Sequence, residues 1–248
     1  MRPVMLITGG SRGIGAACAT QAATAGYDIC FSYVSNPGAA DLVKARCESL
    51  GATAVAVKAD VSVEDDVINL FDTCASELSV PKVFVNNAGV LGQQGELADF
   101  TAERLAWVVN VNVTGALLCM REAARRMSTE RGGAGGSIIN VSSKASTLGS
   151  PFEYVDYAAT KGAVDSATIG LSKELGGAGV RVNCVRPGPI HTDIHASGGE
   201  PDRIARVSKG IPMGRGGEPE EVANLILWLA GDEASYVSGA LIDVAGGR

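Results

Sequence analysis

The sequence predicts a single doubly wound α/β domain, in which a parallel sheet is flanked by helices on both faces. Short runs of β-branched and apolar residues alternate from end to end with longer amphipathic or alanine-rich segments. Continuously apolar runs are typical of strands covered on both faces, which is the arrangement in parallel sheets. The units follow one another so evenly that no linker separates them, so residues 1–248 are predicted to form one domain.

The individual elements follow from these two patterns. Strands are expected where β-branched residues cluster, at residues 4–8, 28–33, 53–58, 83–85, 137–141, 180–185 and 240–244. Helices are expected at residues 14–25, 39–50, 64–78, 101–127, 157–175 and 219–229. A stretch without such a pattern, from Ala196 to Glu218, interrupts the last β-α unit. Structureless insertions of this length are usually functional, and we expect a substrate lid at about residues 190–217.

The composition excludes several classes of protein. With 46% hydrophobic and 19% charged residues, the chain is too apolar for a disordered protein. Its net charge of −6 gives no sign of a basic face for nucleic acid or anionic lipid. The first apolar run ends too early for a signal peptide, and no run is long enough to span a membrane. Six scattered cysteines without a C-x-x-C pair indicate buried thiols in a reducing compartment, so we expect a cytoplasmic protein.

A glycine-rich turn follows the first predicted strand. In TGGSRGIG, residues 8–15, the pattern Gly9-x-x-x-Gly13-x-Gly15 stands directly before the first predicted helix. Glycine allows the backbone to turn tightly and approach a ligand, and the free N–H groups of a helix N-terminus bind a pyrophosphate. The strand–turn–helix setting therefore predicts a nucleotide site, although the spacing is not that of the commoner G-x-G-x-x-G fingerprint.

Four motifs in this order carry a resemblance to a known family: TGGSRGIG (8–15), NNAG (86–89), YAATK (157–161) and RPGPIHTD (186–193). Together they resemble the short-chain dehydrogenase/reductase family over nearly the whole chain. The most similar branches are the bacterial glucose 1-dehydrogenases and 3-oxoacyl-[acyl-carrier-protein] reductases. The resemblance implies a Rossmann-like sheet of seven strands, a nicotinamide cofactor, and the interconversion of an alcohol with a ketone or aldehyde.

Two tyrosines compete for the role of acid–base catalyst in EYVDYAATKGAV, residues 153–164. On a helix, Tyr157 and Lys161 are neighbours on one face, separated by a rise of about 6 Å. Tyr154 would lie about 10.5 Å from Lys161 along the axis, and the preceding Pro151 favours placing it in a loop. A phenol stays protonated at neutral pH unless a nearby cation favours the phenolate. We therefore assign catalysis to Tyr157 with Lys161, and the family's Y-x-x-x-K motif falls on the same pair.

Two further catalytic positions are implied by the resemblance. The serine that holds the substrate oxygen falls on Ser143, at the carboxyl end of a predicted strand, where ligands sit in parallel sheets. The gap from Ser143 to Tyr157 is one residue longer than the family pattern, so Ser142 remains an alternative. The structural and proton-relay asparagine falls on Asn112 rather than on Asn110. Both amides interrupt a predicted helix that is otherwise apolar.

The cofactor is expected to be NADP(H) rather than NAD(H). The segment FSYVSN (31–36) lacks the acidic residue that binds the 2′-hydroxyl of NAD, and Arg12 is placed to pair with a 2′-phosphate. Asp60 would contact the adenine by analogy with the family. The resemblance assigns the cofactor contacts to Gly9, Ser11, Arg12, Gly13, Ile14, Gly15, Tyr33, Asp60, Val61, Asn87, Ala88, Gly89, Tyr157, Lys161, Pro187, Gly188, Ile190 and Thr192.

The substrate is expected to be a small polar molecule such as a sugar or polyol. The alternative is an acyl chain on an acidic carrier protein, which would need basic residues at the pocket mouth. The positions that match the docking arginines of similar 3-oxoacyl reductases are Ser137 and Ala178. The missing docking arginines would have to be replaced by the nearby Arg125, Arg126 and Arg131, or by Arg203 and Arg206 on the lid.

Other readings of the sequence involve a different class of protein or site. A non-catalytic NADP-binding regulator would not need the set of Ser143, Tyr157 and Lys161. A metal hydrolase would have to use His191 and His195, the only two histidines, but these lack the acidic companion of an H-E-x-x-H motif, and we expect no metal. The small residues of the 157–175 helix allow close helix packing. The resemblance implies a homotetramer, or a dimer, built on this helix.

Overall fold

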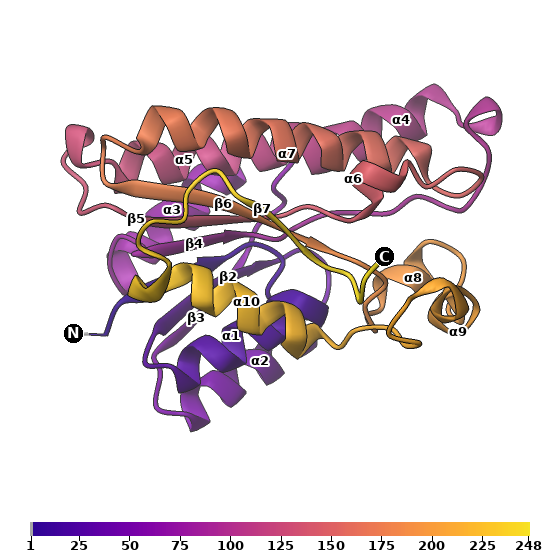
Figure 1. The fold of residues 1–248 in the computed structure, drawn as a ribbon. Helices are drawn as coiled ribbons and strands as arrows, with labels where there is room; N and C mark the ends of the chain where they lie inside the picture. Colours follow the sequence, from indigo (N-terminus) through magenta and orange to yellow (C-terminus); the bar gives the residue numbers. More distant parts are fainter. Residues whose placement is uncertain (1) are drawn as a thin grey trace.

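The computed structural model describes residues 2–248 and contains one parallel sheet of seven strands in the order β3-β2-β1-β4-β5-β6-β7 (Figure 1). The strands are β1 Val4–Ile7, β2 Asp28–Tyr33, β3 Ala54–Lys58, β4 Val83–Asn86, β5 Gly136–Val141, β6 Val180–Pro187 and β7 Leu241–Val244. All neighbouring strands pair in parallel. This confirms the predicted doubly wound, Rossmann-like fold.

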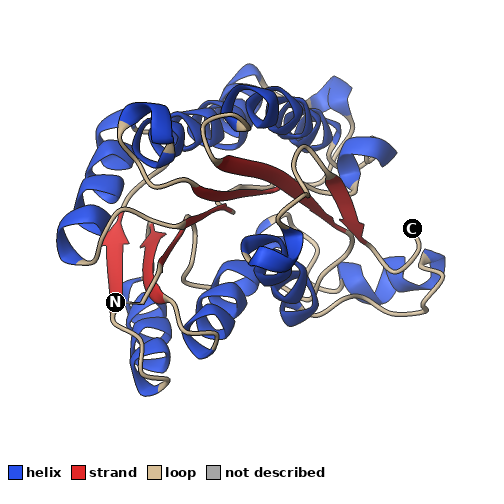
Figure 2. Cartoon of the chain, turned by 60° about the vertical axis from the view of Figure 1, so that its left-hand side comes forward, coloured by secondary structure: helices blue, strands red, loops and turns tan. Residues whose placement is uncertain are grey.

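The helices connect the strands and cover both faces of the sheet (Figure 2). They are α1 Gly13–Thr24, α2 Pro37–Ser49, α3 Glu64–Glu77, α4 Ala102–Val109, α5 Ala116–Met127, α6 Ala145–Leu148, α7 Val155–Leu175, α8 Ile194–Ser197, α9 Arg203–Val207 and α10 Pro219–Ala230. A π-helical turn, η2 Asn110–Gly115, joins α4 to α5. Short 3₁₀ turns lie at Leu97–Asp99, Thr129–Arg131, Ser208–Gly210 and Asp232–Ala234.

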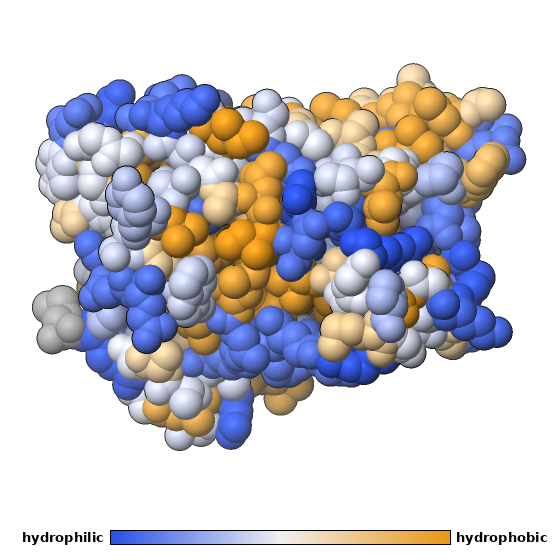
Figure 3. All heavy atoms as spheres, viewed as in Figure 1, coloured by the Kyte–Doolittle hydropathy of each residue, from blue (hydrophilic) through white to orange (hydrophobic). Residues whose placement is uncertain are grey.

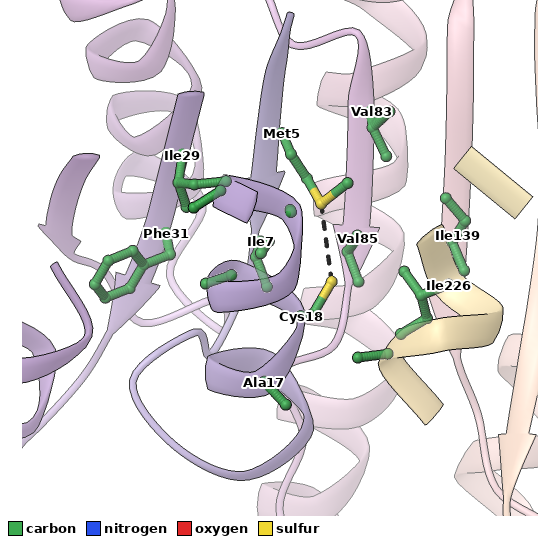
Figure 4. Packing of buried hydrophobic residues seen from close by; sticks show 14 of the residues in the cluster. Met5, Ile7, Ala17, Cys18, Ile29, Phe31, Val83, Val85, Ile139 and Ile226 are labelled. Carbon is green, nitrogen blue, oxygen red and sulfur yellow. Dashed lines mark hydrogen bonds between the residues drawn. The ribbon is translucent and has the colours of Figure 1, made fainter. Parts of the chain in front are cut away.

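Two apolar cores lie on opposite faces of the sheet. One packs α1, α2 and α10 against the strands, and the other packs α3, α5 and α7 (Figure 1). In the first core Cys18 of α1 lies against Met5 of β1, with 3.8 Å between their sulfur atoms (Figure 4). Burial raises the pKa of the Cys18 thiol to about 12, so it acts as a small apolar side chain. All six cysteines are free and buried, as the sequence predicted.

The predicted elements are present, and their ends differ by at most two residues, but the helix predicted at 101–127 is divided into α4 and α5 by the π-helical turn η2. For example, α2 begins at Pro37 rather than residue 39, because the side chain of Asn36 caps the helix by accepting a hydrogen bond from the Ala39 N–H at 3.0 Å. One expectation was wrong. The insertion at 196–218 is not structureless, since it carries the end of α8, all of α9 and a 3₁₀ turn. Gly198, Gly199, Pro201 and Gly210 keep these helices too short to show a periodicity in the sequence.

The topology determines where a ligand can bind. The chain runs outward from β1 to β3 and then returns to the other side of β1 to form β4. At such a switch point the loops after β1 and β4 diverge and leave a crevice beyond the carboxyl ends of the strands. In Figure 1 helices α8 and α9, which belong to the segment expected to form a lid and called the lid below, lie at this end of the sheet together with the C-terminus.

The outer surface mixes polar and apolar side chains (Figure 3). An apolar band crosses the middle of this view, where Figure 1 shows β7, whose apolar residues are only half-buried at the edge of the sheet. Within residues 2–248 no helix combines the length and the hydropathy needed to cross a bilayer.

A buried carboxylate stabilises the helical layer away from this crevice. Glu122 of α5 is only 3% exposed and accepts hydrogen bonds from three arginines, Arg121 at 3.2 Å, Arg125 at 2.8 Å, and Arg126. Burial by itself would raise the pKa of Glu122, but the hydrogen bonds and charges of Arg126 and Arg125 outweigh it and the pKa is lowered. A carboxyl group with a lowered pKa in the folded state stabilises the fold above its unfolded pKa, and this contribution is lost as the pH falls through the folded pKa.

We therefore expect Glu122→Gln to lower the free energy of unfolding by about 1–3 kcal/mol at pH 7, because the buried acceptor for three guanidinium groups loses its charge. The difference from the wild type should begin to shrink as the pH falls below about 4, and it should vanish once the pH has passed through the lowered folded-state pKa, where the wild-type carboxyl group is also neutral. Denaturant unfolding of both proteins at pH 7 and below about pH 4 measures these differences in the free energy of unfolding.

Asp72→Asn provides the matched control, since Asp72 binds the same Arg126 at 2.6 Å but its side chain is 64% exposed. Asp72→Asn should lower the free energy of unfolding by less than about 1 kcal/mol. An equal cost for both variants, or a Glu122→Gln deficit that persists at low pH, would show that the buried pair is not what stabilises this layer.

Candidate active site

A cavity of about 860 Å³ lies at the carboxyl edge of the sheet. Its walls come from the loops that follow β1 to β6, from the start of α7 and from the lid. Ligand sites of doubly wound sheets occur at this position. The predicted residues that line it are Gly9, Ser11, Arg12, Gly13, Ile14, Tyr33, Asp60, Val61, Asn87, Ala88, Gly89, Ser143, Tyr157, Lys161, Pro187, Gly188, Ile190 and Thr192.

The glycine turn after β1 has the geometry that its sequence predicts. Gly9 and Gly13 adopt φ values of +65° and +53°, which side chains disfavour. Gly15 does not line the cavity as expected, because it packs inside the turn, where a Cβ would lie 2.3 Å from the carbonyl oxygen of Gly9. The residue before α1, Arg12, makes no capping hydrogen bond with its side chain. The first N–H groups of α1 therefore lack a side-chain cap beside the cavity.

The loops after β1 and β4 are joined by hydrogen bonds. The hydroxyl oxygen of Thr8 accepts from the N–H groups of Asn87 and Ala88, both at 3.0 Å. The side-chain amide of Asn87 donates to the carbonyl oxygens of Thr8 at 2.9 Å and Gly9 at 3.1 Å. The NNAG motif thus fixes the glycine turn from the far side of the switch point.

Tyr157 and Lys161 lie together on α7, as their spacing predicts. Lys161 is 4% exposed, and its Nζ lies 5.6 Å from the centre of the Tyr157 ring. The ammonium group donates to the carbonyl oxygen of Val141 at 2.8 Å, which anchors it to the end of β5. The Tyr157 ring is half-buried and lines the cavity. This pairs a phenol with a desolvated cation.

The two serines after β5 have different surroundings. Ser142 is buried, and its hydroxyl donates to the carbonyl oxygen of Lys161 at 2.9 Å. Ser143 is partly exposed, and its hydroxyl oxygen accepts from the N–H of Ala145 at 3.1 Å. The Ser143 hydroxyl hydrogen therefore stays free to point into the cavity, whereas that of Ser142 is already used.

Asn112 is buried behind the cavity and does not line it. Its side-chain amide accepts from the N–H of Val90 at 2.8 Å and donates to the Val90 carbonyl oxygen at 2.9 Å and to the Thr160 hydroxyl at 3.2 Å. It lies within the π-helical turn η2, a feature that often marks functional sites and that sequence periodicity does not reveal.

The end of β2 is free of carboxylates. Residues Ser32 to Asn36 all line the cavity, and Arg12 is an exposed cation in the same wall. Beside the end of β2, after the neighbouring strand β3, Asp60 accepts hydrogen bonds on one carboxylate oxygen from the Ser62 N–H at 2.9 Å and the Ser62 hydroxyl at 2.7 Å. The uncapped helix N-terminus and the single cation fit a phosphate-bearing dinucleotide, because nothing in this wall repels a 2′-phosphate.

Tyr154 has a different role from Tyr157. It precedes the first residue of α7, is 2% exposed, and donates its hydroxyl to the carbonyl oxygen of Gly198 in the lid at 3.2 Å. The neighbouring Glu153 binds Arg203 and Arg206 of α9, each at 2.5 Å. These residues attach the lid to the loop before α7. Sequence reasoning missed this attachment because its partners are about fifty residues apart in the chain.

The two histidines lie in different surroundings. His191 is exposed, with its Nε2 4.0 Å from Glu218, and does not line the cavity. His195 is buried, with its Nε2 2.9 Å from the carbonyl oxygen of Ile190. No set of three His, Cys, Asp or Glu side chains within residues 2–248 is grouped to hold a metal ion.

Comparison with known proteins places the chain in a family. A family model described as "Enoyl-(Acyl carrier protein) reductase" matches residues 9–248. An uncharacterized oxidoreductase of Escherichia coli, YgfF, is 51% identical over 99% of both chains. A 3-oxoacyl-[acyl-carrier-protein] reductase of Synechocystis is 38% identical over 98% of this chain and 96% of that protein. Glucose 1-dehydrogenase 2 of Bacillus subtilis is 34% identical over 98% of this chain and 93% of that protein.

Solved structures of short-chain dehydrogenases resemble this chain over almost its whole length. A short-chain type dehydrogenase/reductase of Mycobacterium marinum superposes with a TM-score of 0.92 at 33% identity, covering 99% of this chain and 94% of that chain. A short-chain dehydrogenase of Burkholderia cenocepacia in complex with NADP superposes with a TM-score of 0.89 at 31% identity, covering 99% of this chain and 97% of that chain. With the glycine turn, the Tyr157–Lys161 pair and the seven-stranded sheet, these likenesses establish that the chain is an oxidoreductase of the short-chain dehydrogenase/reductase family.

Proposed function

We propose that the protein is an NADP(H)-dependent oxidoreductase that interconverts an alcohol and a ketone or aldehyde on a small, free, polar substrate such as a sugar or polyol. The observation that carries this proposal is the set of Ser143, Tyr157 and Lys161 around one cavity. A non-catalytic NADP-binding regulator has no need for a phenol beside a buried cation.

In the proposed reaction, Ser143 and Tyr157 hold the substrate oxygen. A bound nicotinamide cofactor would supply or accept the hydride. Ser143 donates its free hydroxyl hydrogen to the carbonyl oxygen, and Tyr157 gives its phenolic proton to that oxygen or takes it back in the reverse direction. Lys161 favours the phenolate that remains, because its ammonium group is desolvated and fixed by Val141. Asn112 keeps the Val90 loop in position behind Lys161, and we retain it as the residue that supports a proton relay.

Tyr157→Phe should lower kcat by about 10²- to 10⁴-fold with little change in cofactor affinity, because the proton donor is lost while the cradle for the phosphates stays intact. The measurements are steady-state kinetics and a fluorescence titration with NADPH. Tyr154→Phe is the matched control, since it removes the other phenol of the same segment. It should retain most of kcat. Full activity in Tyr157→Phe together with loss in Tyr154→Phe would reverse the assignment.

The preference for NADP(H) is supported by the carboxylate-free wall after β2 and by Arg12. The NADP complex of the related Burkholderia enzyme adds support. Arg12→Ala should raise the KM for NADPH by about 10- to 100-fold and change that for NADH little, because an ionic hydrogen bond to a phosphate is lost.

Arg46→Ala is the control for the loss of charge, since Arg46 is exposed on α2 and does not line the cavity. It should leave both KM values unchanged. A wild-type enzyme with a higher kcat/KM for NADH than for NADPH would rule out the cofactor proposal.

A free substrate is favoured over a carrier-bound one because the two arginines of the lid that line the cavity, Arg203 and Arg206, are already paired. Arg203 and Arg206 bind Glu153, and Arg206 also binds Glu200 at 2.5 Å. Ser137 and Ala178 are buried and do not line the cavity, and Arg126 is bound by Glu122 and Asp72. An acidic carrier protein would have to break such pairs to dock. The 3-oxoacyl-carrier-protein reductase function remains the second candidate, since relatives of both kinds match the chain.

A kinetic comparison separates these candidates. With NADPH, the kcat/KM for small free ketones, aldehydes or sugars should exceed that for acetoacetyl-carrier protein, and raising the salt concentration should change it little. A much higher kcat/KM for acetoacetyl-carrier protein, falling steeply with salt, would favour the second candidate instead.

We also propose a homotetramer, or a dimer, as the assembled form. Gly162 and Gly170 of α7 meet no atom within 4 Å of a Cβ built on them, so this small-residue face is not used inside the chain. Exposed Trp107, Leu117 and Ile169 lie on α4, α5 and α7. Helix faces of this kind support packing against another copy. Six buried thiols that remain free support a cytoplasmic location.

A further inference from the structure

A buried ion pair involves the residue directly before Tyr157. Asp156 is only 7% exposed, and its carboxylate accepts hydrogen bonds from Arg104 of α4, from Nε at 2.8 Å and from Nη2 at 3.3 Å. The two nitrogens contact different carboxylate oxygens, which is the bidentate geometry of strong arginine–carboxylate pairs. One of these oxygens also accepts from the Tyr157 N–H at 2.8 Å. The pair therefore joins the start of α7 to α4, across 52 residues of the chain.

The guanidinium group of Arg104 is also fixed by other contacts. Its carbon lies 3.3 Å from the centre of the Phe100 ring, and its Nη1 donates to the carbonyl oxygen of Gln93. A Cβ on Gly92 would lie 2.8 Å from Arg104 Nε, so a glycine at this position leaves room for the guanidinium group. The side chain of Arg104 is 16% exposed. One mostly buried cation thus contacts both the loop after β4 and the start of α7.

Tyr157 lies in the part of α7 that depends most on such a contact. It is the third residue of the helix, and the first turn of a helix frays more easily than its interior. Tyr154, the residue before α7, provides no side-chain cap, and the loop that leads to it holds Ser150 and Phe152 at positive φ. The contacts with β5 that hold Lys161 lie one turn further along the helix. The ion pair is therefore a tertiary contact that holds the turn carrying this phenol.

We propose that Arg104 and Asp156 are positioning residues, which hold the Tyr157 phenol at the place from which it transfers the proton. This inference rests on the proposed function. Neither of the two side chains lines the cavity, so neither is placed to bind the substrate or the cofactor. Their effect on the reaction passes through Tyr157, whose backbone N–H the carboxylate binds. Proton transfer is sensitive to such placement, since a displacement of about 1 Å can lower a rate by about 10²-fold.

The first test removes the cation and leaves Tyr157 itself unchanged. Arg104→Gln should lower kcat by about 10- to 100-fold, with no change in the affinity for NADPH or in the number of NADPH molecules bound per chain. A loss of folded protein would lower that number instead. In the Tyr157→Phe background, the same substitution should lower the remaining kcat by less than about twofold, because the residue through which it acts is gone. A residue that only stabilises the fold would lower kcat by the same factor in both backgrounds.

Fluorine NMR reports the position of the phenol without any turnover. The chain has five tyrosines, and when all are replaced by fluorotyrosine the Tyr157 resonance is the one that Tyr157→Phe removes. Arg104→Gln should shift or broaden this resonance. Arg104→Lys keeps a cation beside the buried carboxylate but loses the bidentate contact. It should therefore fold even where Arg104→Gln does not, and it should still move the Tyr157 resonance.

Asp165→Asn is the matched control. Asp165 is a second buried carboxylate of α7, and it lies 3.7 Å from Arg186. It follows Tyr157 by more than two helical turns, about 12 Å along the axis. Asp165→Asn should change neither kcat nor the Tyr157 resonance. An effect as large as that of Arg104→Gln would show that any buried charge of this helix matters equally, and the inference would be wrong.

The outcomes separate the two proposals. A Tyr157 resonance that neither Arg104 variant moves, or an equal loss of kcat with and without the Tyr157 phenol, overturns this inference and leaves the proposed function intact. If the wild type turns over no alcohol, ketone or aldehyde with either nicotinamide cofactor, the proposed function fails. The fluorine spectra then decide by themselves whether the ion pair positions Tyr157.

Discussion

The site depends on one buried cation. Lys161 has lost most of its contact with water. Within residues 2–248 its ammonium group donates one hydrogen bond, to the carbonyl oxygen of Val141. An unpaired buried ammonium is costly, so the fold has to supply this acceptor at a fixed place. Val141 is the last residue of β5, and the next residue, Ser142, donates back to the carbonyl oxygen of Lys161. These two hydrogen bonds attach α7 to the end of β5. They determine which way Ser143 and Tyr157 face, because Ser143 follows directly after Ser142 and Tyr157 lies one helical turn before Lys161.

A second layer of polar contacts holds this arrangement from behind. Gly89 has no side chain because a Cβ there would lie 3.3 Å from Asn112 Oδ1 and 3.4 Å from Lys161 Nζ. The Asn112 amide fixes Val90, the residue after Gly89, by two hydrogen bonds. The π-helical turn allows the polar side chain of Asn112 to reach that loop from a helix whose buried residues are mostly apolar. The NNAG loop therefore connects two functions of the site. Asn87 holds the glycine turn on one side, and Gly89 leaves room for the ammonium group on the other.

The sequence was sufficient for the fold and for the centre of the site because both depend on local patterns. Continuous apolar runs mark the strands, and the four-residue spacing distinguishes Tyr157 from Tyr154 without any tertiary information. The parts that could not be predicted depend on distant contacts. The pairing of Glu153 with Arg203 and Arg206 joins segments fifty residues apart, and the lid helices are too short for a periodicity. The packing of Gly15 inside the turn could not be predicted, because a glycine needed for packing and a glycine needed for a ligand look the same in sequence. The roles of the site residues stay predictions.

The two ends of the cavity differ in the kind of structure that forms their walls. In the proposed function, proton transfer takes place at one end and substrate selection at the other. The end beside the glycine turn uses backbone groups, glycines and the ends of strands, so substitutions there disturb the sheet itself. The lid end uses side chains on short helices that are attached by ion pairs and by the hydrogen bond from Tyr154 to Gly198. The loop beneath it carries Ser150 and Phe152 at φ values of +43° and +63°, a backbone that its lid contacts have to hold in place. Residues 150–154 and the lid therefore form one unit. In the proposed function, the selection of the substrate falls to this unit, whereas the proposed proton transfer at Tyr157 depends on the end of β5.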